Sequence, residues 1–402
     1  MSASATTPYA SITCREPVML LQGVVGFYFA FRLSISYLFF QSDPKSGAAV
    51  SVALNLLLLV AVAFHSLGPA PVPLSSTLRV PCFRWVIAFL VLSFCSLLWS
   101  ATVSVPVALG YWCGMAADVA MVVLLLRTGP VNNASAALMK GYIWGACSIA
   151  VVTWLSPTMK DLRPGNDDFF SPNAIGFTCA FGVFLAQYLN RTGSRWSIPA
   201  IFLGITLLRS LSKTTITAFV VAETLLLVRD TSISRRSKIA IAAASLLVLA
   251  AFWGLIVAYY DVYTNAGDQA ETLTGRVGIW LFVLDRSLEQ PWIGHGFHSF
   301  RNVIPPFGTF EAWHAHNELL QQFYTYGVAG VVLVACLYTS FYRQLRRIGS
   351  RSLKQLLASL LLFILVRGLG DTERFDLSFP LWAIALISLT LALPEPLEEV
   401  IA

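Results

Sequence analysis

Long apolar runs are the feature that most constrains how this chain can fold. Runs of about 16–24 mainly hydrophobic residues recur from Val18 to Leu393, and an α-helix needs roughly 20 such residues to cross a bilayer. The chain is 56% hydrophobic and only 12% charged, whereas about 25% of the residues in a soluble domain carry charge. The runs are continuous and do not alternate, which favours helices over the strands of a membrane barrel. We therefore expect an all-α polytopic membrane protein.

The runs predict about twelve transmembrane helices. The predicted spans are 18–40, 49–67, 82–100, 104–126, 139–157, 173–190, 197–211, 213–228, 237–260, 317–342, 353–369 and 378–394. They divide the chain into a bundle of about nine spans at 1–260, a large loop at 261–316, and about three C-terminal spans with a short cytoplasmic tail at 317–402. The first run is too long for the core of a signal peptide, so we expect it to be retained as a helix. The short spans 197–211 and 213–228 also fit one re-entrant hairpin.

The charges in the connecting segments predict the orientation of the bundle. With the N-terminus in the cytoplasm, the inner segments hold most of the Lys and Arg residues and the outer segments most of the Asp and Glu residues. This distribution follows the positive-inside rule, so the loop 261–316 is expected outside, facing the periplasm or the exterior. The net charge of +6 is dispersed over short loops, and binding to nucleic acid is not expected.

A few charged residues fall inside the predicted spans, namely Arg32, Asp118 and Glu223. A charge at membrane depth is costly, so these side chains either face a cavity or pair with one another. The sequence leaves both possibilities open.

The stretch from Thr274 to Gly330 is the one long interval that can stay in water, and it holds four of the five histidines. Thr274 is a candidate N-cap for a helix at 276–290 that Pro291 would stop. Its apolar residues recur at helical spacing, which predicts a short amphipathic helix lying flat on the membrane. These residues are Val277, Trp280, Leu281, Leu284 and Leu288.

His316 is the strongest candidate for a catalytic base. Asn317 is a good N-cap, and Glu318 suits the positive end of the apolar helix that follows. His316 would then lie beside a helix N-terminus, where the dipole disfavours the imidazolium and leaves a neutral base. The alternative is a histidine that only caps or packs.

Arg276 is a candidate phosphate ligand. In the first turn of the 276–290 helix, its guanidinium and the free backbone amides form a phosphate-binding arrangement. The alternative is an ordinary surface arginine.

The histidines also raise the possibility of a metal site. His295, His298, His314 and His316 could supply ligands, but no acidic residue or cysteine stands at a diagnostic spacing. The seven cysteines form no CxxC pair, and none lies in the large loop. No metal and no other cofactor is therefore predicted.

Several short motifs follow one another in a fixed order. They are Pro172-Asn173, Ser210-Leu211-Ser212-Lys213, Thr274-Gly275-Arg276 with Ile279-Trp280, Pro291-x-x-Gly294-x-Gly296-Phe297, and His316-Asn317 with Gly327-x-x-Gly330. In this order they resemble the motifs of the bacterial O-antigen ligase and polymerase superfamily. Residues 1–150 match only in hydropathy.

The resemblance implies a metal-independent glycan transferase of the bacterial inner membrane, with its active site facing the periplasm. Family members take a glycan from an undecaprenyl-diphosphate carrier and move it to lipid A–core, to another carrier-linked repeat or to a protein hydroxyl. The expected partners are therefore this lipid-linked donor, a lipid A–core or glycan acceptor, and the bilayer.

The resemblance also assigns roles to residues. The catalytic histidine corresponds to His316, and the carrier-phosphate cations correspond to Arg276 and Lys213. Many members have Arg in place of Lys213, and Arg grips a diphosphate with two donors whereas Lys is a point charge. Arg209, one helical turn earlier, and Arg367 are further candidate phosphate ligands. The residues expected to support the site are Asn317, His314, His295 and Asn173.

The sequence does not identify the acceptor. Transfer to lipid A–core, as by an O-antigen ligase, is the first hypothesis, and polymerisation of O-antigen or exopolysaccharide repeats is the alternative. A secondary transporter is the alternative from another class. Few charges lie within the spans and no paired broken helices are evident, which argues against transport.

Overall fold

The computed structural model describes residues 16–40, 43–67, 72–159, 162–166, 170–193, 195–230, 233–265, 273–301, 303–306, 312–372 and 380–393. Within these ranges all regular structure is helical, apart from one isolated bridge between Thr158 and Pro164. The prediction of an all-α protein is confirmed.

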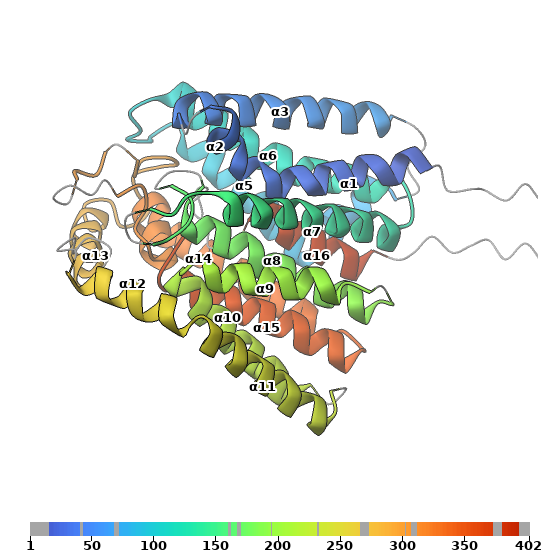
Figure 1. The fold of residues 1–402 in the computed structure, drawn as a ribbon. Helices are drawn as coiled ribbons and strands as arrows, with labels where there is room; N and C mark the ends of the chain where they lie inside the picture. Colours follow the sequence, from blue (N-terminus) through green and yellow to red (C-terminus); the bar gives the residue numbers. More distant parts are fainter. Residues whose placement is uncertain are drawn as a thin grey trace, which may run out of the picture.

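Most of the helices lie side by side along one common direction and form a bundle (Figure 1). The helices of the first half are α1 (Glu16–Phe31), the short turn η1 (Arg32–Ser34), α2 (Ile35–Phe39), α3 (Pro44–His65), α4 (Leu74–Arg79), α5 (Pro81–Ser96), α6 (Val105–Arg127), α7 (Val131–Leu155) and α8 (Pro172–Arg191). Those of the second half are α9 (Ser197–Arg209), α10 (Lys213–Arg229), α11 (Arg235–Ala251), α12 (Trp253–Asn265), α13 (Leu273–Ser287), α14 (Glu318–Arg346), α15 (Arg351–Gly368) and α16 (Leu381–Ala392).

Each predicted span coincides with a helix or with consecutive helices. The span 18–40 contains α1, η1 and α2, and the span 237–260 is divided between α11 and α12. Within the described part of the chain, four helices are long and apolar enough to cross a membrane, and these are α3, α6, α7 and α14. The chain is therefore a multi-pass membrane protein, while the count of about twelve spans stays a prediction.

Close contact between α1 and α7 depends on glycine. A Cβ at Gly26 would lie 1.9 Å from the carbonyl oxygen of Leu138, and a Cβ at Gly141 would lie 2.0 Å from that of Gly23. Gly141 and Gly145 form a G-x-x-x-G pair on α7, the spacing that lets two helices approach closely inside a membrane. Two backbones thus meet where larger residues would separate them.

The charged residues inside the bundle pair with one another or with amides. Arg32 donates to both carboxylate oxygens of Asp118 at 3.0 and 2.8 Å, and the amide of Asn55 donates to the same carboxylate at 2.8 Å. The carboxylate of Glu223 accepts from Gln187 at 2.9 Å. Pairing compensates part of the cost of holding these charges away from water.

The helix after His316 begins as the sequence predicts. Asn317 is its N-cap, and its side chain accepts a hydrogen bond from the backbone N–H of Leu320 at 3.1 Å. Glu318 follows in the first turn, and its buried carboxylate accepts from Tyr338 at 2.7 Å. α14 is broken at Gly327, whose φ of 64° and ψ of −156° are not helical.

The break in α14 receives the backbone of the turn 291–296. A Cβ at Gly327 would lie 2.4 Å from the carbonyl carbon of Trp292, and a Cβ at Gly294 would lie 2.5 Å from the backbone of Thr325 and Tyr326. Backbone hydrogen bonds of 2.8–2.9 Å join the two segments. They run from the N–H of His295 to Tyr324, of Gly296 to Thr325 and of Val328 to Pro291. The glycines of two separate motifs therefore serve one contact, which fixes the large loop to α14.

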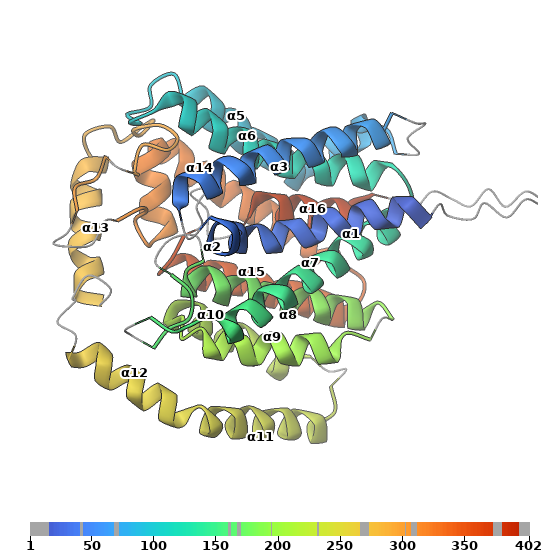
Figure 2. The ribbon, with the colours of Figure 1, turned by 45° about the horizontal axis from the view of Figure 1, so that its top comes forward.

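The helix of the large loop differs from its predicted bounds. α13 begins at Leu273, so Thr274 lies in its first turn and the prediction that Thr274 caps the helix is wrong. It ends at Ser287 and does not reach Gln290, because the chain turns there before Pro291. Figure 2 shows α13 running across the end of the bundle and not along it.

The large loop also has a small apolar core of its own, which a purely polar loop would lack. Ile279 and Val283 of α13 are fully buried, together with further residues of the loop and of α14. These further residues are Phe300, Ile304, Ala312, Ala315 and Tyr324. The opposite face of α13 keeps the predicted stripe exposed at Val277, Leu281, Leu284 and Leu288. A helix buried on one face and apolar on the other fits a position against the membrane surface.

We predict that the end of the bundle carrying α13 is on the periplasmic or exterior side of the membrane. Glu289 is half-exposed just after α13, and Gly349 lies in open space between α14 and α15 at the other end. In a variant with the exposed Cys95 replaced by Ser, Glu289→Cys should react with an impermeant thiol reagent on spheroplasts. Gly349→Cys should react only after lysis. The reverse pattern would overturn the orientation.

We predict that the fold depends on the close backbone contact at Gly294 and Gly327. Gly327→Ala adds a Cβ against the backbone of Trp292 at a positive φ, which should lower the unfolding free energy by at least about 2 kcal/mol. Gly294→Ala should act similarly. Gly278→Ala is the matched control, since nothing lies near its Cβ on exposed α13 and alanine favours a helix by about 0.5–1 kcal/mol. Thermal unfolding in detergent measures all three, and equal midpoints would contradict the prediction.

Candidate active site

Four segments meet at the end of the bundle where α13 lies (Figure 1). They are the first turn of α13, the residues 312–317 that precede α14, the turn 369–372 that follows α15, and the first turn of α10, which holds Lys213 and Thr214. The contacts described below join all four.

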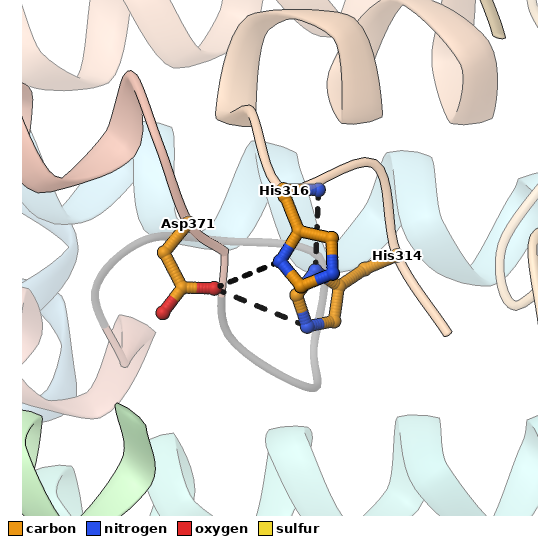
Figure 3. A group of neighbouring side chains, drawn as sticks. All are labelled: His314, His316 and Asp371. Carbon is orange, nitrogen blue, oxygen red and sulfur yellow. Dashed lines mark hydrogen bonds and ion pairs between the residues drawn. The ribbon is translucent and has the colours of Figure 1, made fainter. Parts of the chain in front are cut away.

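Asp371 is the centre of a group of titratable side chains. Its Oδ1 lies 3.6 Å from Nδ1 of His316 and 4.0 Å from Nε2 of His314 (Figure 3). Its Oδ2 accepts from Arg367 at 3.0 Å, and Oδ1 accepts from the backbone N–H of Thr372 at 3.0 Å. One carboxylate thus faces two imidazoles and a guanidinium.

The hydrogen bonds around the two histidines indicate their tautomers. Nδ1 of His314 accepts from the backbone N–H of His316 at 3.3 Å, so the proton of His314 is placed on Nε2, which faces Asp371. Nδ1 of His316 also faces the carboxylate, which favours a proton there. Nε2 is then the basic nitrogen of His316. Enzymes that use histidine as a general base often orient its imidazole with a carboxylate in this way.

Burial and charge set the protonation of this group. Burial alone raises the pKa of Asp371, but the Arg367 guanidinium and the two neighbouring histidines lower it below its usual range. Asp371 therefore stays a carboxylate. Burial, followed by the neighbouring His316 ring, lowers the pKa of His314 to about 3, so His314 is neutral at physiological pH.

The backbone at His316 is strained. Its φ is +50°, a left-handed conformation that non-glycine residues rarely adopt and that costs about 1–3 kcal/mol. Leu211 in the turn between α9 and α10 has a φ of +52°, and Leu162 has a φ of +65°. Strain of this kind gathers where the surrounding structure imposes a side-chain direction, and functional sites are the usual place.

Two side chains hold the segment that carries the histidines. Trp280 of α13 donates to the carbonyl of Ala315 at 2.9 Å, and the amide oxygen of Gln321 accepts from the N–H of Ala315 at 2.7 Å. Ala315 stands between His314 and His316, so both histidines are fixed by its bonds. The Ile279-Trp280 motif thus positions the histidines through Trp280, while Ile279 fills the loop core.

Arg276 joins α13 to two other segments. Its Nη1 donates to the carbonyl of Gly370 at 2.6 Å and to the hydroxyl of Thr214 at 3.3 Å. Gly370 precedes Asp371, and Thr214 follows the exposed Lys213 at the start of α10. The structure therefore brings Arg276 and Lys213 to the same end of the bundle as His316.

Three of the predicted residues act on turns next to this group. The hydroxyl of Ser212 lies 2.8 Å from Oδ1 of Asn173, so Asn173 supports the turn that leads to Lys213. Arg209 donates to the carbonyl of Leu162 at 3.2 Å. The amide of Asn317 donates to the carbonyl of Leu369 at 3.2 Å, which ties the cap of α14 to the end of α15.

Arg367 and His295 are placed differently from the other predicted residues. Arg367 is buried, contacts Asp371, and lies over the ring of Phe177 at 4.5 Å. His295 lies within the large loop, where its Nε2 is 2.9 Å from the carbonyl oxygen of Arg286 and its ring stacks on Tyr324 at 4.6 Å. Its contacts are those of a side chain that stabilises the loop.

Asp371 was not among the residues predicted from the sequence. Arg367, four residues earlier, was among them as a candidate phosphate ligand. The signal that could have found it is a carboxylate four residues after a buried arginine in a chain with few acidic residues. Its pairing with His316 joins distant parts of the chain, so no local spacing shows it.

The same three side chains are the candidate metal ligands among the described residues. The ligand atoms of His314, His316 and Asp371 lie within 4.8 Å of one another, and two imidazoles with a carboxylate suit zinc. The charges nearby oppose a dication, because Arg367 contacts Asp371 and Arg276 contacts the adjacent Gly370. That balance of charge supports the prediction that the site works without a metal.

Comparison with known proteins agrees with these features. A family model described as O-antigen ligase matches residues 198–335, which include Lys213, Arg276 and His316. The chain is also 25% identical over 295 residues to the exopolysaccharide production protein ExoQ of Rhizobium meliloti (strain 1021). By both comparisons the chain is similar to the O-antigen ligase and polymerase superfamily.

The alignment with ExoQ covers 67% of this chain and 66% of the relative, slightly less than two thirds of its length. The family model ends before Asp371, so the assignment of Asp371 rests on the geometry alone.

We predict opposite stability effects at the two ends of the His316–Asp371 contact. Asn tolerates a positive φ, so His316→Asn should keep the unfolding free energy at or above that of the wild type, by up to about 1 kcal/mol. Asp371→Asn leaves the buried Arg367 without its countercharge and should cost about 3–5 kcal/mol. Thermal unfolding in detergent measures both. A His316→Asn variant less stable than the wild type would disprove the strain at His316.

Proposed function

We propose that this protein transfers a glycan from an undecaprenyl-diphosphate carrier to an acceptor hydroxyl at the outer face of the bacterial inner membrane. The observation that carries the proposal is the imidazole of His316 facing the Asp371 carboxylate, with Arg276 bound to the neighbouring Gly370. A base and a phosphate ligand are the two groups that this transfer needs. Similarity to the superfamily supports the substrate class.

The proposed base is Nε2 of His316. It takes the proton from the acceptor hydroxyl while Asp371, facing Nδ1, stabilises the imidazolium that forms. His314, neutral at physiological pH, completes the acceptor side of the site by fixing the backbone of His316. The acceptor oxygen then bonds to the anomeric carbon of the donor as the bond to the carrier diphosphate breaks.

The leaving diphosphate is stabilised by the cations beside the base. Arg276 makes both of its contacts through Nη1, so the fork of Nε and Nη2 faces the diphosphate in this proposal. Lys213, next to the Thr214 that Arg276 contacts, adds a second positive charge. The diphosphate leaves as an anion, so no proton donor is required. In-line attack inverts the anomeric centre.

The contacts refine two of the roles expected from the sequence. Arg367 is buried against Asp371 and Phe177, so we assign it to holding the charge and direction of Asp371 and not to phosphate. Arg209 donates to the backbone carbonyl of Leu162, whereas Lys213 is adjacent to Thr214, which Arg276 contacts. Lys213 is therefore the preferred second phosphate ligand.

Two candidate functions share this glycan-transfer chemistry and differ only in the acceptor. Transfer to lipid A–core follows from the description of the family model as O-antigen ligase. Polymerisation of exopolysaccharide or O-antigen repeats is supported by the relative named for exopolysaccharide production. Transport, the candidate from another class, finds less support, because Arg32 and Asp118 pair with each other in the bundle.

Deletion of the gene, followed by gel analysis of glycolipids, tests the proposal. Loss of long glycan from lipid A–core with carrier-linked polymer retained indicates a ligase. A single repeat still attached to the core, or loss of secreted polymer, indicates a polymerase. If deletion changes neither the glycan on lipid A–core nor the carrier-linked and secreted polymer, this function is excluded.

We predict the activity of variants in the purified enzyme with lipid-linked donor. His316→Asn and Asp371→Asn should each lose about 10²–10⁴-fold in rate, because one removes the base and the other its orientation. Arg276→Ala should lose most of the activity and Arg276→Lys should recover part, because lysine cannot make a two-donor contact. EDTA should have no effect.

Arg286→Gln is the matched control for Arg276, because Arg286 lies on the same helix and its guanidinium forms an ion pair with the half-exposed Glu289. It should retain near wild-type rate. Full activity of well-folded His316→Asn would remove His316 as the base. Inhibition by EDTA would instead favour a metal bound by His314, His316 and Asp371.

A further inference from the structure

A second polar site lies at the end of the bundle opposite to the candidate active site. A cavity of about 340 Å³ opens between the ends of α10 and α14 and the beginning of α15. This volume lies within the range of about 300–1,000 Å³ that small-molecule sites occupy. α14 connects the two sites, because His316 and Asn317 precede it and Arg346 ends it.

Three cationic side chains converge on the cavity, one from each helix. They are Arg229 at the end of α10, Arg346 at the end of α14 and Lys354 in the first turn of α15. Among the described residues that line the cavity, no side chain is acidic. The nearby Asp230 is buried and pairs with Arg191 at 2.7 Å. Like charges held together in this way favour an anionic ligand.

The helix dipoles explain only part of this arrangement. Arg229 and Arg346 stand in the last turns of their helices, where a cation is favourable. Lys354 stands in the first turn of α15, where the dipole disfavours a cation. An anion bound between the three side chains accounts for all of them.

Two further side chains of the cavity have polar atoms without a partner. Ser359 is 1% exposed, and within the described part of the chain its hydroxyl has no hydrogen-bond partner. The same holds for Oε1 of Gln355, whose Nε2 donates to the carbonyl of Arg229. Buried polar atoms are normally bonded, so these two point to a ligand with its own hydroxyl or phosphate oxygens.

The remaining lining is apolar and indicates a lipid. Leucine and alanine side chains form one wall, and Tyr342 is 47% exposed at the rim. The helical stretch from Val328 to Arg346 rises about 28 Å at 1.5 Å per residue, close to the thickness of the hydrocarbon core. The cavity therefore lies at the depth of the headgroups of the leaflet at that end.

We propose that this cavity binds the headgroup of an anionic phospholipid. Arg229, Arg346 and Lys354 hold its phosphate, and Gln355 and Ser359 bond to a headgroup hydroxyl. A phosphate flanked by a glycerol hydroxyl, as in phosphatidylglycerol, matches both sets of side chains. Basic cavities between membrane helices are suited to such lipids.

Native mass spectrometry of the full-length protein tests this proposal. The purified protein is titrated with phosphatidylglycerol and, separately, with phosphatidylcholine. We expect one tight phosphatidylglycerol that phosphatidylcholine does not replace. Arg346→Gln and Lys354→Gln should each weaken it about tenfold, the effect of losing one charged hydrogen bond.

Arg343→Gln and Arg347→Gln are the matched controls, because both lie on the same helix end but do not line the cavity. They should leave the affinity unchanged. Equal losses in control and cavity variants would overturn the proposal in favour of diffuse attraction to an anionic surface. Equal binding of both lipids would also overturn it.

The source of the phosphate is tested in the same preparation. Inorganic phosphate and glycerol 1-phosphate, added at millimolar concentration, should not displace the bound lipid. Displacement would show that the cavity binds a soluble anion and would overturn the assignment to a lipid. If Arg346→Gln does not fold, Lys354→Gln alone decides, since its side chain is partly exposed at the start of a helix.

Discussion

The buried carboxylate of Asp371 is the interaction on which the candidate active site depends. Its two oxygens connect α15, through Arg367, with the segment that holds His314 and His316. The preceding Gly370 accepts from Arg276 and so connects α13 to the same place. Segments far apart in the chain thus contact one charge, and that charge favours Nε2 as the nitrogen of His316 that accepts a proton.

The membrane explains why these contacts lie at the end of the bundle. Inside the hydrocarbon layer the backbone must bond to itself, so irregular segments are confined to the ends of helices or to protein interiors. The break in α14 at Gly327 obeys this rule, because its backbone groups bond to the turn that begins at Pro291. The same contact gives the large loop a rigid base, and its own apolar core around Ile279 makes it a small folded unit.

Much of this arrangement could be predicted from the sequence where the signal is local. Apolar runs give the helices, and Asn317 identifies the start of α14 because a cap bonds only three residues away. The motifs also grouped Arg276, Lys213 and His316 at one end. The prediction that Thr274 caps α13 was wrong, because the helix already begins at Leu273, one residue before Thr274. Asp371 was missed because helix packing brings His316 next to it. Hydropathy does not predict contacts between residues that are distant in the sequence.

The left-handed backbone at His316 limits which residue types can occupy this position without strain. Selection for stability alone would replace the residue with glycine or asparagine, which accept that conformation at lower cost. A histidine at this position agrees with the base proposed above, because stability by itself gives no reason to prefer it over asparagine. If His316 is that base, the His316→Asn variant would hold the lipid-linked donor without transferring its glycan, and it would be suited to trapping the bound substrate for direct observation.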